Sequence, residues 1–147
     1  QVPGKNAKLY KIILDLPIVG TLIYNIACSK QFITKEFLTN YYYNPYSVKT
    51  RIIDAYHESA HLGESPKSVY ASLKCNYVKC NIAAALKKID NSIYLLGGDA
   101  IDDISECMEE YKEYNPAIEW TVVPNTKSLP HLEKPTEVFD VIQTYLS

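Results

Sequence analysis

SIYLLGG at residues 92–98 and AIEWTVV at residues 117–123 are the two stretches that decide the fold class. Both runs are short and rich in β-branched and aromatic residues, which favour strands. Between them, residues 104–114 repeat apolar side chains with the spacing of an amphipathic helix. A strand, a helix and a second strand in this order predict a parallel βαβ unit, with strands near residues 92–97 and 117–123.

The remaining sequence predicts helices. Residues 135–146 form the expected last helix, after a loop at 124–130. Upstream, Pro and Gly separate apolar-periodic runs that predict helices near residues 5–16, 18–28, 34–42, 47–61, 65–76 and 82–88. Thr34 and Ser47 are the residues expected to begin two of them. We therefore predict an α/β chain with two parts, an all-helical region at 1–90 and a β-α-β-loop-α region at 91–147.

Composition excludes several classes of protein. The formal net charge of −2 offers no basic field for nucleic acid. No run of 18 apolar residues exists, so no membrane-spanning helix is expected. The four cysteines form no CxxC pair, which favours reduced thiols, no shared metal and a cytoplasmic location. No cofactor is expected. The chain begins with Gln1 instead of Met, which suggests a processed product or a fragment.

Two strands alone do not form a stable parallel sheet, because such sheets are covered on both faces and contain more strands. We therefore expect the missing strands to come from a preceding half of the protein or from a partner chain.

The tail sequence SLPHLEKP, residues 128–135, has a distinctive spacing. Pro130, Glu133 and Pro135 match the late G-H-x-P-x-x-E-x-P segment of the α/β-hydrolase fold family, and residues 91–147 resemble the last two strands and helices of that fold. The resemblance implies that the helical region at 1–90 is a cap. It also implies a serine hydrolase of small esters or amides, with Ser, His and Asp or Glu as the triad.

The catalytic residues of that family are only partly matched. G-x-S-x-G is absent from the chain, so the nucleophile would lie elsewhere. The position of the family's catalytic histidine falls on Ser128, and a Ser hydroxyl cannot act as a base near neutral pH. His131, three residues later, is the candidate replacement. For the acid, strict alignment reaches Ile101.

The candidate acids are therefore the neighbours of Ile101, namely Asp99 and Asp102, with Asp103 beside them. An acidic loop that caps the following helix through Asp102 or Asp103 explains the same residues equally well.

A rival motif occurs in the helical region. His57, Glu58 and His61 match H-E-x-x-H, which on a helix presents two imidazoles to Zn²⁺ and a carboxylate to a bound water. No further ligand follows at the usual spacing, so an exposed helix face explains the motif as well.

Three functions follow from these patterns. The first is the C-terminal portion of a serine hydrolase with a small-molecule substrate, inactive alone. The second is a non-catalytic binding or interaction protein of the same fold, because Ser128 replaces the histidine. The third is a zinc hydrolase built on the H-E-x-x-H motif.

Overall fold

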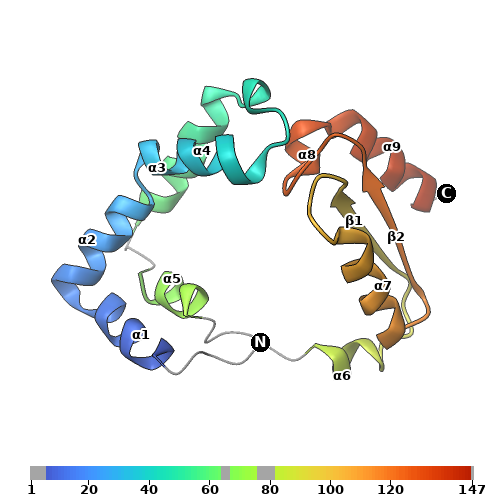
Figure 1. Ribbon diagram of the computed structural model, residues 1–147, viewed down its shortest axis with the longest axis horizontal. Coiled ribbons are helices and arrows are strands. Elements are labelled where there is room, and N and C mark those ends of the chain that lie inside the picture. The colour runs from blue at the N-terminus through green and yellow to red at the C-terminus, as the bar shows by residue number, and fades with distance from the viewer. Residues whose placement is uncertain (1–5, 64–66, 76–81, 147) are drawn as a thin grey trace. The chain divides into compact units, whose positions relative to one another are not determined.

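A computed structural model of the chain describes residues 6–63, 67–75 and 82–146. Contacts divide the chain into two compact units, whose elements are labelled in Figure 1. The helical unit spans residues 1–35 and 49–81, and the strand unit spans residues 36–48 and 82–147. Each unit is described by itself.

The described part of the helical unit contains α1 (Ala7–Asp15), α2 (Pro17–Ala27), most of α3 (Lys30–Glu36), α4 (Thr50–His61) and α5 (Lys67–Lys74). Helix α5 contacts both α1 and α2, and in Figure 1 it lies inside the angle between them. Tyr24 is buried here: its hydroxyl donates to the Ala60 carbonyl oxygen at 2.8 Å, and its ring meets Tyr70 edge-on. One tyrosine thus ties α2 to α4 and α5.

A sharp corner separates α1 from α2. Leu16 has an extended backbone (φ −59°, ψ 138°), and Pro17 begins α2, where an amide hydrogen is not needed. A Cβ on Gly20 would lie 1.9 Å from the carbonyl oxygen of Leu14, so only glycine fits where the two helices meet. In the part of the chain that the structure describes, no single helix is long and apolar enough to cross a bilayer. Helices α1 and α2 meet that requirement only as a pair, bent by 95°.

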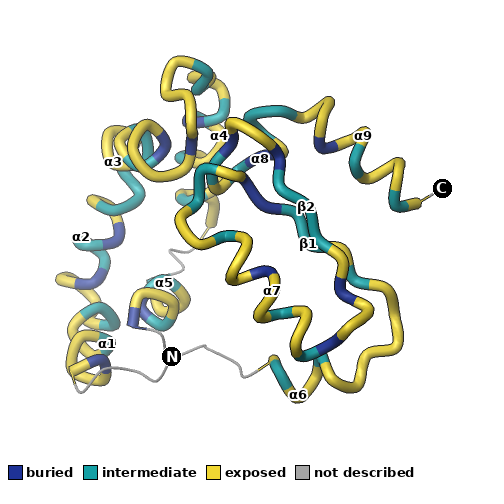
Figure 2. Tube along the Cα trace, turned by 45° about the vertical axis from the view of Figure 1, so that its right-hand side comes forward, coloured by how far each residue is buried: buried dark blue, intermediate teal, exposed yellow. Residues whose placement is uncertain are grey.

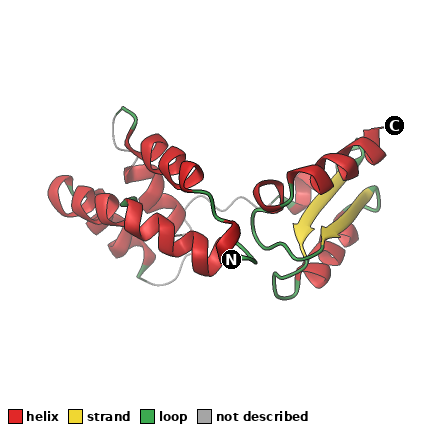
Figure 3. Cartoon of the chain, turned by 90° about the horizontal axis from the view of Figure 1, so that it is seen from above, coloured by secondary structure: helices red, strands yellow, loops and turns green. Residues whose placement is uncertain are grey.

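The strand unit contains the predicted parallel pair. Strands β1 (Ile93–Gly98) and β2 (Ile118–Val123) are paired in parallel, with Ile93 opposite Ile118 and Gly98 opposite Val123. Helix α7 (Ile104–Tyr114) connects them and lies on one face, and α9 (Pro135–Leu146) lies on the other (Figure 3). The prediction of a mixed α/β chain with a parallel βαβ unit is confirmed.

Alternating side chains of β1 meet the two helices. Gly97 faces α7, because a Cβ there would lie 2.8 Å from Met108 Cε. Tyr94 faces α9, where its ring centroid lies 4.0 Å from that of Tyr145. The sheet is therefore covered on both faces, as a parallel sheet requires.

Short elements complete the strand unit. They are the π-helix η1 (Phe37–Tyr41), the 3₁₀ turn η2 (Pro45–Ser47), α6 (Ala83–Leu86) and α8 (Pro130–Glu133). Asn115 anchors α6 by donating to the carbonyl oxygens of Leu86 and Ile89, both at 2.9 Å.

Two predicted helix starts are wrong. Thr34 lies inside α3 and donates its hydroxyl to the Lys30 carbonyl oxygen, so it does not cap the helix. Ser47 ends η2 instead of opening a helix, and α4 begins at Thr50. Asn44 explains the second error, because its side chain accepts from the amide of Tyr46 and stabilises a separate turn.

Contacts group residues 36–48 and 82–90 with the strands, although both segments were predicted from sequence to be part of the helical region. Phe37, only 1% exposed, packs against Tyr41 and Tyr42, with ring centroids 5.5 and 5.6 Å from its own. The assignment of residues 1–90 as a cap stays a prediction.

Candidate functional site

The loops that follow β1 and β2 lie together at the carboxyl end of the sheet. A Cβ on Gly98 would lie 2.1 Å from the Lys127 carbonyl oxygen, so the second loop passes directly over the end of β1. Two backbone hydrogen bonds join the loops: Asp99 N–H donates to Val123 O at 3.2 Å, and Ala100 N–H donates to Thr126 O at 3.0 Å. Parallel strands thus bring the acid and base candidates to one edge of the sheet.

Asp99 takes part in this junction. Its Oδ1 accepts from the amide of Thr126 at 3.4 Å, while the residue as a whole is exposed. Thr126 is fully buried and donates its hydroxyl to the Val123 carbonyl oxygen at 2.8 Å. The Asp99 carboxylate therefore fixes the second loop against the first, and it faces solvent beside Thr126.

Asp102 and Asp103 are both exposed in the turn before α7. Asp103 occupies the N-cap position of α7 in a left-handed conformation (φ 57°), and its side chain makes no capping hydrogen bond. The prediction that the Asp103 side chain caps α7 is therefore wrong. Asp102 remains an exposed carboxylate three residues beyond Asp99.

Ser128 is held by the segment that contains η1. Its amide donates to the Tyr41 carbonyl oxygen at 3.2 Å, and its hydroxyl donates to the Asn40 carbonyl oxygen at 3.4 Å. Next to it, Lys127 Nζ donates to the Thr39 carbonyl oxygen at 3.0 Å. The position that resembles the family's catalytic histidine thus carries a hydroxyl engaged with backbone.

His131 is exposed on α8, one turn beyond Ser128. Among the described residues, no hydrogen bond or ion pair joins His131 to Asp99, Asp102 or Ser128. Asp99, Asp102 and Ser128 therefore lie on the loops after β1 and β2, and His131 lies on α8, without forming a hydrogen-bonded triad.

Glu133 is a residue whose role was missed from sequence. Its Oε1 accepts from the amide of Lys127 at 2.7 Å, and its Oε2 accepts from the amides of Tyr43 and Asn44 at 2.8 and 3.5 Å. One carboxylate therefore fastens the loop after β2 to the segment after η1. The matching glutamate in the tail motif was the available signal, but sequence does not show which amides it meets.

The H-E-x-x-H motif lies on α4, as predicted. The ring centroids of His57 and His61 are 4.4 Å apart, and His61 Nδ1 lies 2.8 Å from the His57 carbonyl oxygen. Glu58 is exposed. Within residues 6–63, 67–75 and 82–146, no three His, Cys, Asp or Glu side chains are grouped to hold a metal. The zinc hypothesis lacks a third ligand there.

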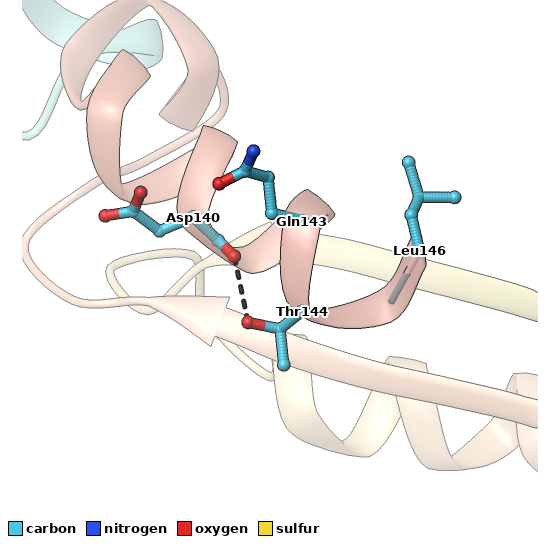
Figure 4. A pocket seen from close by; sticks show the side chains of 4 residues that line it. All are labelled: Asp140, Gln143, Thr144 and Leu146. Atoms are coloured by element: carbon cyan, nitrogen blue, oxygen red, sulfur yellow. Dashed lines mark hydrogen bonds between the residues drawn. The ribbon is translucent and has the colours of Figure 1, made fainter.

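The described residues of the strand unit form three depressions that the candidate catalytic residues do not line. The first, of about 720 Å³, is an open hollow along one helix, lined by Asp140, Gln143, Thr144 and Leu146. Figure 4 shows these side chains projecting from α9, with the Thr144 hydroxyl bonded to the Asp140 carbonyl oxygen at 2.9 Å.

The other two depressions differ in character. An apolar groove of about 140 Å³ runs between β1 and α9, lined by Tyr94, Leu95, Leu96, Val141, Ile142, Tyr145 and Leu146. A third, more polar hollow of about 570 Å³ lies beside α7 and β2, where Trp120 Nε1 donates to Glu109 Oε1 at 3.1 Å.

Comparison with known proteins adds no relative. No protein-family model matches the chain, and no curated protein matches it significantly.

Proposed function

We propose that the strand unit is the C-terminal part of an α/β-hydrolase-like sheet, and that the complete protein hydrolyses a small ester or amide with a serine nucleophile outside this chain. The observation that carries the proposal is the junction at the carboxyl end of the sheet. There the loop after β1 and the loop after β2 are bonded through Asp99 and Thr126. The tail motif supports it, because Glu133 orders the loop that precedes the last helix.

In the proposed chemistry, the serine oxygen attacks the acyl carbon and expels the alcohol or amine. A base takes the serine proton and returns it to the leaving group, and water then releases the acid by the same route. His131 is the imidazole of the strand unit, since the other two histidines of the chain are His57 and His61. Asp99 or Asp102 would orient it. This chemistry requires no cofactor.

A non-catalytic binding protein of the same fold is the second candidate. Ser128 favours it, because its hydroxyl is bonded to the Asn40 carbonyl oxygen and cannot replace an imidazole. In this alternative, the carboxyl-end loops serve recognition and no ester is cleaved.

An esterase assay separates the hydrolase from the non-catalytic candidate. It measures hydrolysis of p-nitrophenyl acetate and butyrate by the protein made from the complete reading frame. The hydrolase predicts turnover above the buffer rate and covalent labelling by a fluorophosphonate. It also predicts a loss of about 10²-fold or more in kcat/KM for His131→Ala, the scale of general-base catalysis. His57→Ala, in the helical unit, is the matched control and should keep full activity. Absence of both turnover and labelling would support the non-catalytic candidate. A gain of activity in Ser128→His would show that the site lacks an imidazole at position 128.

A further inference from the structure

Helix α2 exposes apolar side chains where a helix of a soluble protein normally exposes polar ones. Ile18, Leu22 and Ile26, spaced four residues apart on one face, are 82%, 60% and 57% exposed. The opposite face carries the two buried residues of the helix, Gly20 and Tyr24. The exposed face of α2 is therefore apolar. Figure 2 shows buried and exposed positions alternating along this helix.

Helix α1 continues this surface around the corner. Leu9 and Ile12 share one face of α1, Leu16 directly follows the end of that helix, and all three are exposed. We name these three residues together with Ile18, Leu22 and Ile26 the apolar corner. Single exposed apolar residues are ordinary, but six of them on two helices joined at one corner indicate an interaction surface.

Charged residues are nearly absent between Ile12 and Ser29, and the rest of the helical unit is rich in basic residues. From Ile12 to Ser29 the sequence has one charged residue, Asp15, and its carboxylate is bonded to Lys11 Nζ at 2.5 Å. The helical unit as a whole has ten Lys or Arg against four Asp or Glu, whereas the strand unit has five against thirteen. Lys8 is exposed beside the corner. Beyond the end of α2, the side chain of Lys30 is 54% exposed and forms an ion pair with Asp54.

An exposed apolar surface on a basic unit is complementary to an anionic lipid surface. Apolar side chains enter the boundary between headgroups and acyl chains, and lysines meet the headgroups. The eleven residues of α2 extend about 16 Å at 1.5 Å per residue, about half the thickness of a hydrocarbon core. With the 95° bend, the geometry suits a position in the interface, without crossing the membrane.

We propose that the apolar corner binds the surface of lipid bilayers that contain anionic headgroups, with the basic helical unit facing the membrane. The proposal is independent of the hydrolase proposal, which concerns the strand unit. Esterase activity and vesicle binding can therefore fail separately.

Co-sedimentation of the full chain with vesicles tests it. We expect binding to vesicles of phosphatidylcholine and phosphatidylserine, weaker binding to pure phosphatidylcholine, and a decline with added NaCl. The double variant Ile18→Gln with Leu22→Gln should weaken vesicle binding about tenfold or more, because two apolar side chains that enter the boundary between headgroups and acyl chains are replaced by polar ones. The matched control is Phe139→Gln with Leu146→Gln, which removes two exposed apolar residues from α9 and should leave binding unchanged.

A second measurement remains decisive if the double variant folds poorly. Ile18→Trp should show a blue-shifted emission and quenching by brominated lipid, whereas Phe139→Trp should show neither. Absence of binding to anionic vesicles overturns the proposal. A second result also overturns it: the protein dimerises with rising concentration, does not bind vesicles, and loses the dimer in the double variant Ile18→Gln with Leu22→Gln. A second copy of the chain would then cover the apolar corner.

Discussion

Glu133 joins three backbone amides of the strand unit through one carboxylate, at 2.7, 2.8 and 3.5 Å. Glu133→Ala should lower the free energy of unfolding of that unit by about 2–3 kcal/mol, because hydrogen bonds to a charged acceptor are among the stronger ones and the amides lose their partner. Urea unfolding followed by the fluorescence of Trp120 measures this. Glu137→Ala is the matched control: this exposed carboxylate forms an ion pair with Lys134, and its removal should change stability by less than about 0.5 kcal/mol.

Tyr24 predicts a dependence of stability on high pH. Burial, helped by the neighbouring Cys28, raises the pKa of its hydroxyl to about 12 in the folded protein. The unfolded pKa is about 10, so the native state favours the neutral form. Its stabilising contribution is present below pH 10 and is lost as the pH rises from 10 to 12.

Tyr24→Phe should reduce this alkaline dependence, to which Tyr70 also contributes because burial raises its pKa, and should cost about 1 kcal/mol at pH 7 through the lost bond to Ala60. Urea unfolding followed by circular dichroism of the helices, at pH 7 and between pH 8 and 12, measures both effects. Tyr10→Phe, at an exposed tyrosine, is the control. Equal alkaline loss in Tyr24→Phe and the unmodified protein would contradict the assignment.

Sequence predicted residue types better than residue partners. Asp99 and Ser128 were selected as candidates through the resemblance to the hydrolase family, and the structure brings the loops that contain them together. The bonds of Ser128 to residues 40 and 41 were not predictable, since they join positions 88 and 87 apart in the chain. Asp103 shows the reverse: an acidic residue stands at the expected N-cap position, but its left-handed backbone leaves the side chain without a capping bond.

At the scale of elements, Gly98 and Gly97 form a natural pair of test sites in β1. Gly98→Ala brings a Cβ within 2.1 Å of a backbone carbonyl oxygen, so the loop after β2 must move. Gly97→Ala meets the flexible end of Met108 at 2.8 Å, which can shift. We expect a loss of about 3 kcal/mol or more for Gly98→Ala and about 1–2 kcal/mol for Gly97→Ala, from the cost of overpacking. Equal losses in thermal unfolding would show that the two loops are not in close contact.

The elements that sequence predicted well are those with a clear period. Residues 104–114 and 135–146 form helices within the predicted bounds, because apolar side chains recur with helical spacing and Pro marks the turns. The predicted bounds are wrong where local interactions or close packing compete with the periodic pattern. The first strand was predicted to end near residue 97, but Gly98 also belongs to β1, since the missing side chains of Gly97 and Gly98 admit α7 and the second loop.

At the scale of the whole molecule, the chain consists of two units of opposite charge. Each has its own contacts, so we expect two unfolding transitions in differential scanning calorimetry. Tyr24→Phe should shift only the transition of the helical unit, and Glu133→Ala only that of the strand unit. A single transition shifted by both variants would mean that the units unfold together.

The division into units could be predicted only in part. A change from helical to α/β character near residue 90 is visible in the hydrophobic pattern. Membership of residues 36–48 in the strand unit is not visible there, because it depends on contacts such as the bond between Tyr43 and Glu133, 90 positions apart. Local periodicity contains no information about such a distant contact.

That distant contact has a consequence for biosynthesis. The segment 36–48 leaves the ribosome well before Glu133, which lies 90 positions after its partner Tyr43. Contacts of such long range form slowly and leave apolar groups such as Phe37 unprotected in the meantime. During translation, residues 36–48 therefore stay exposed to chaperones until the helices that follow β2 have been synthesised.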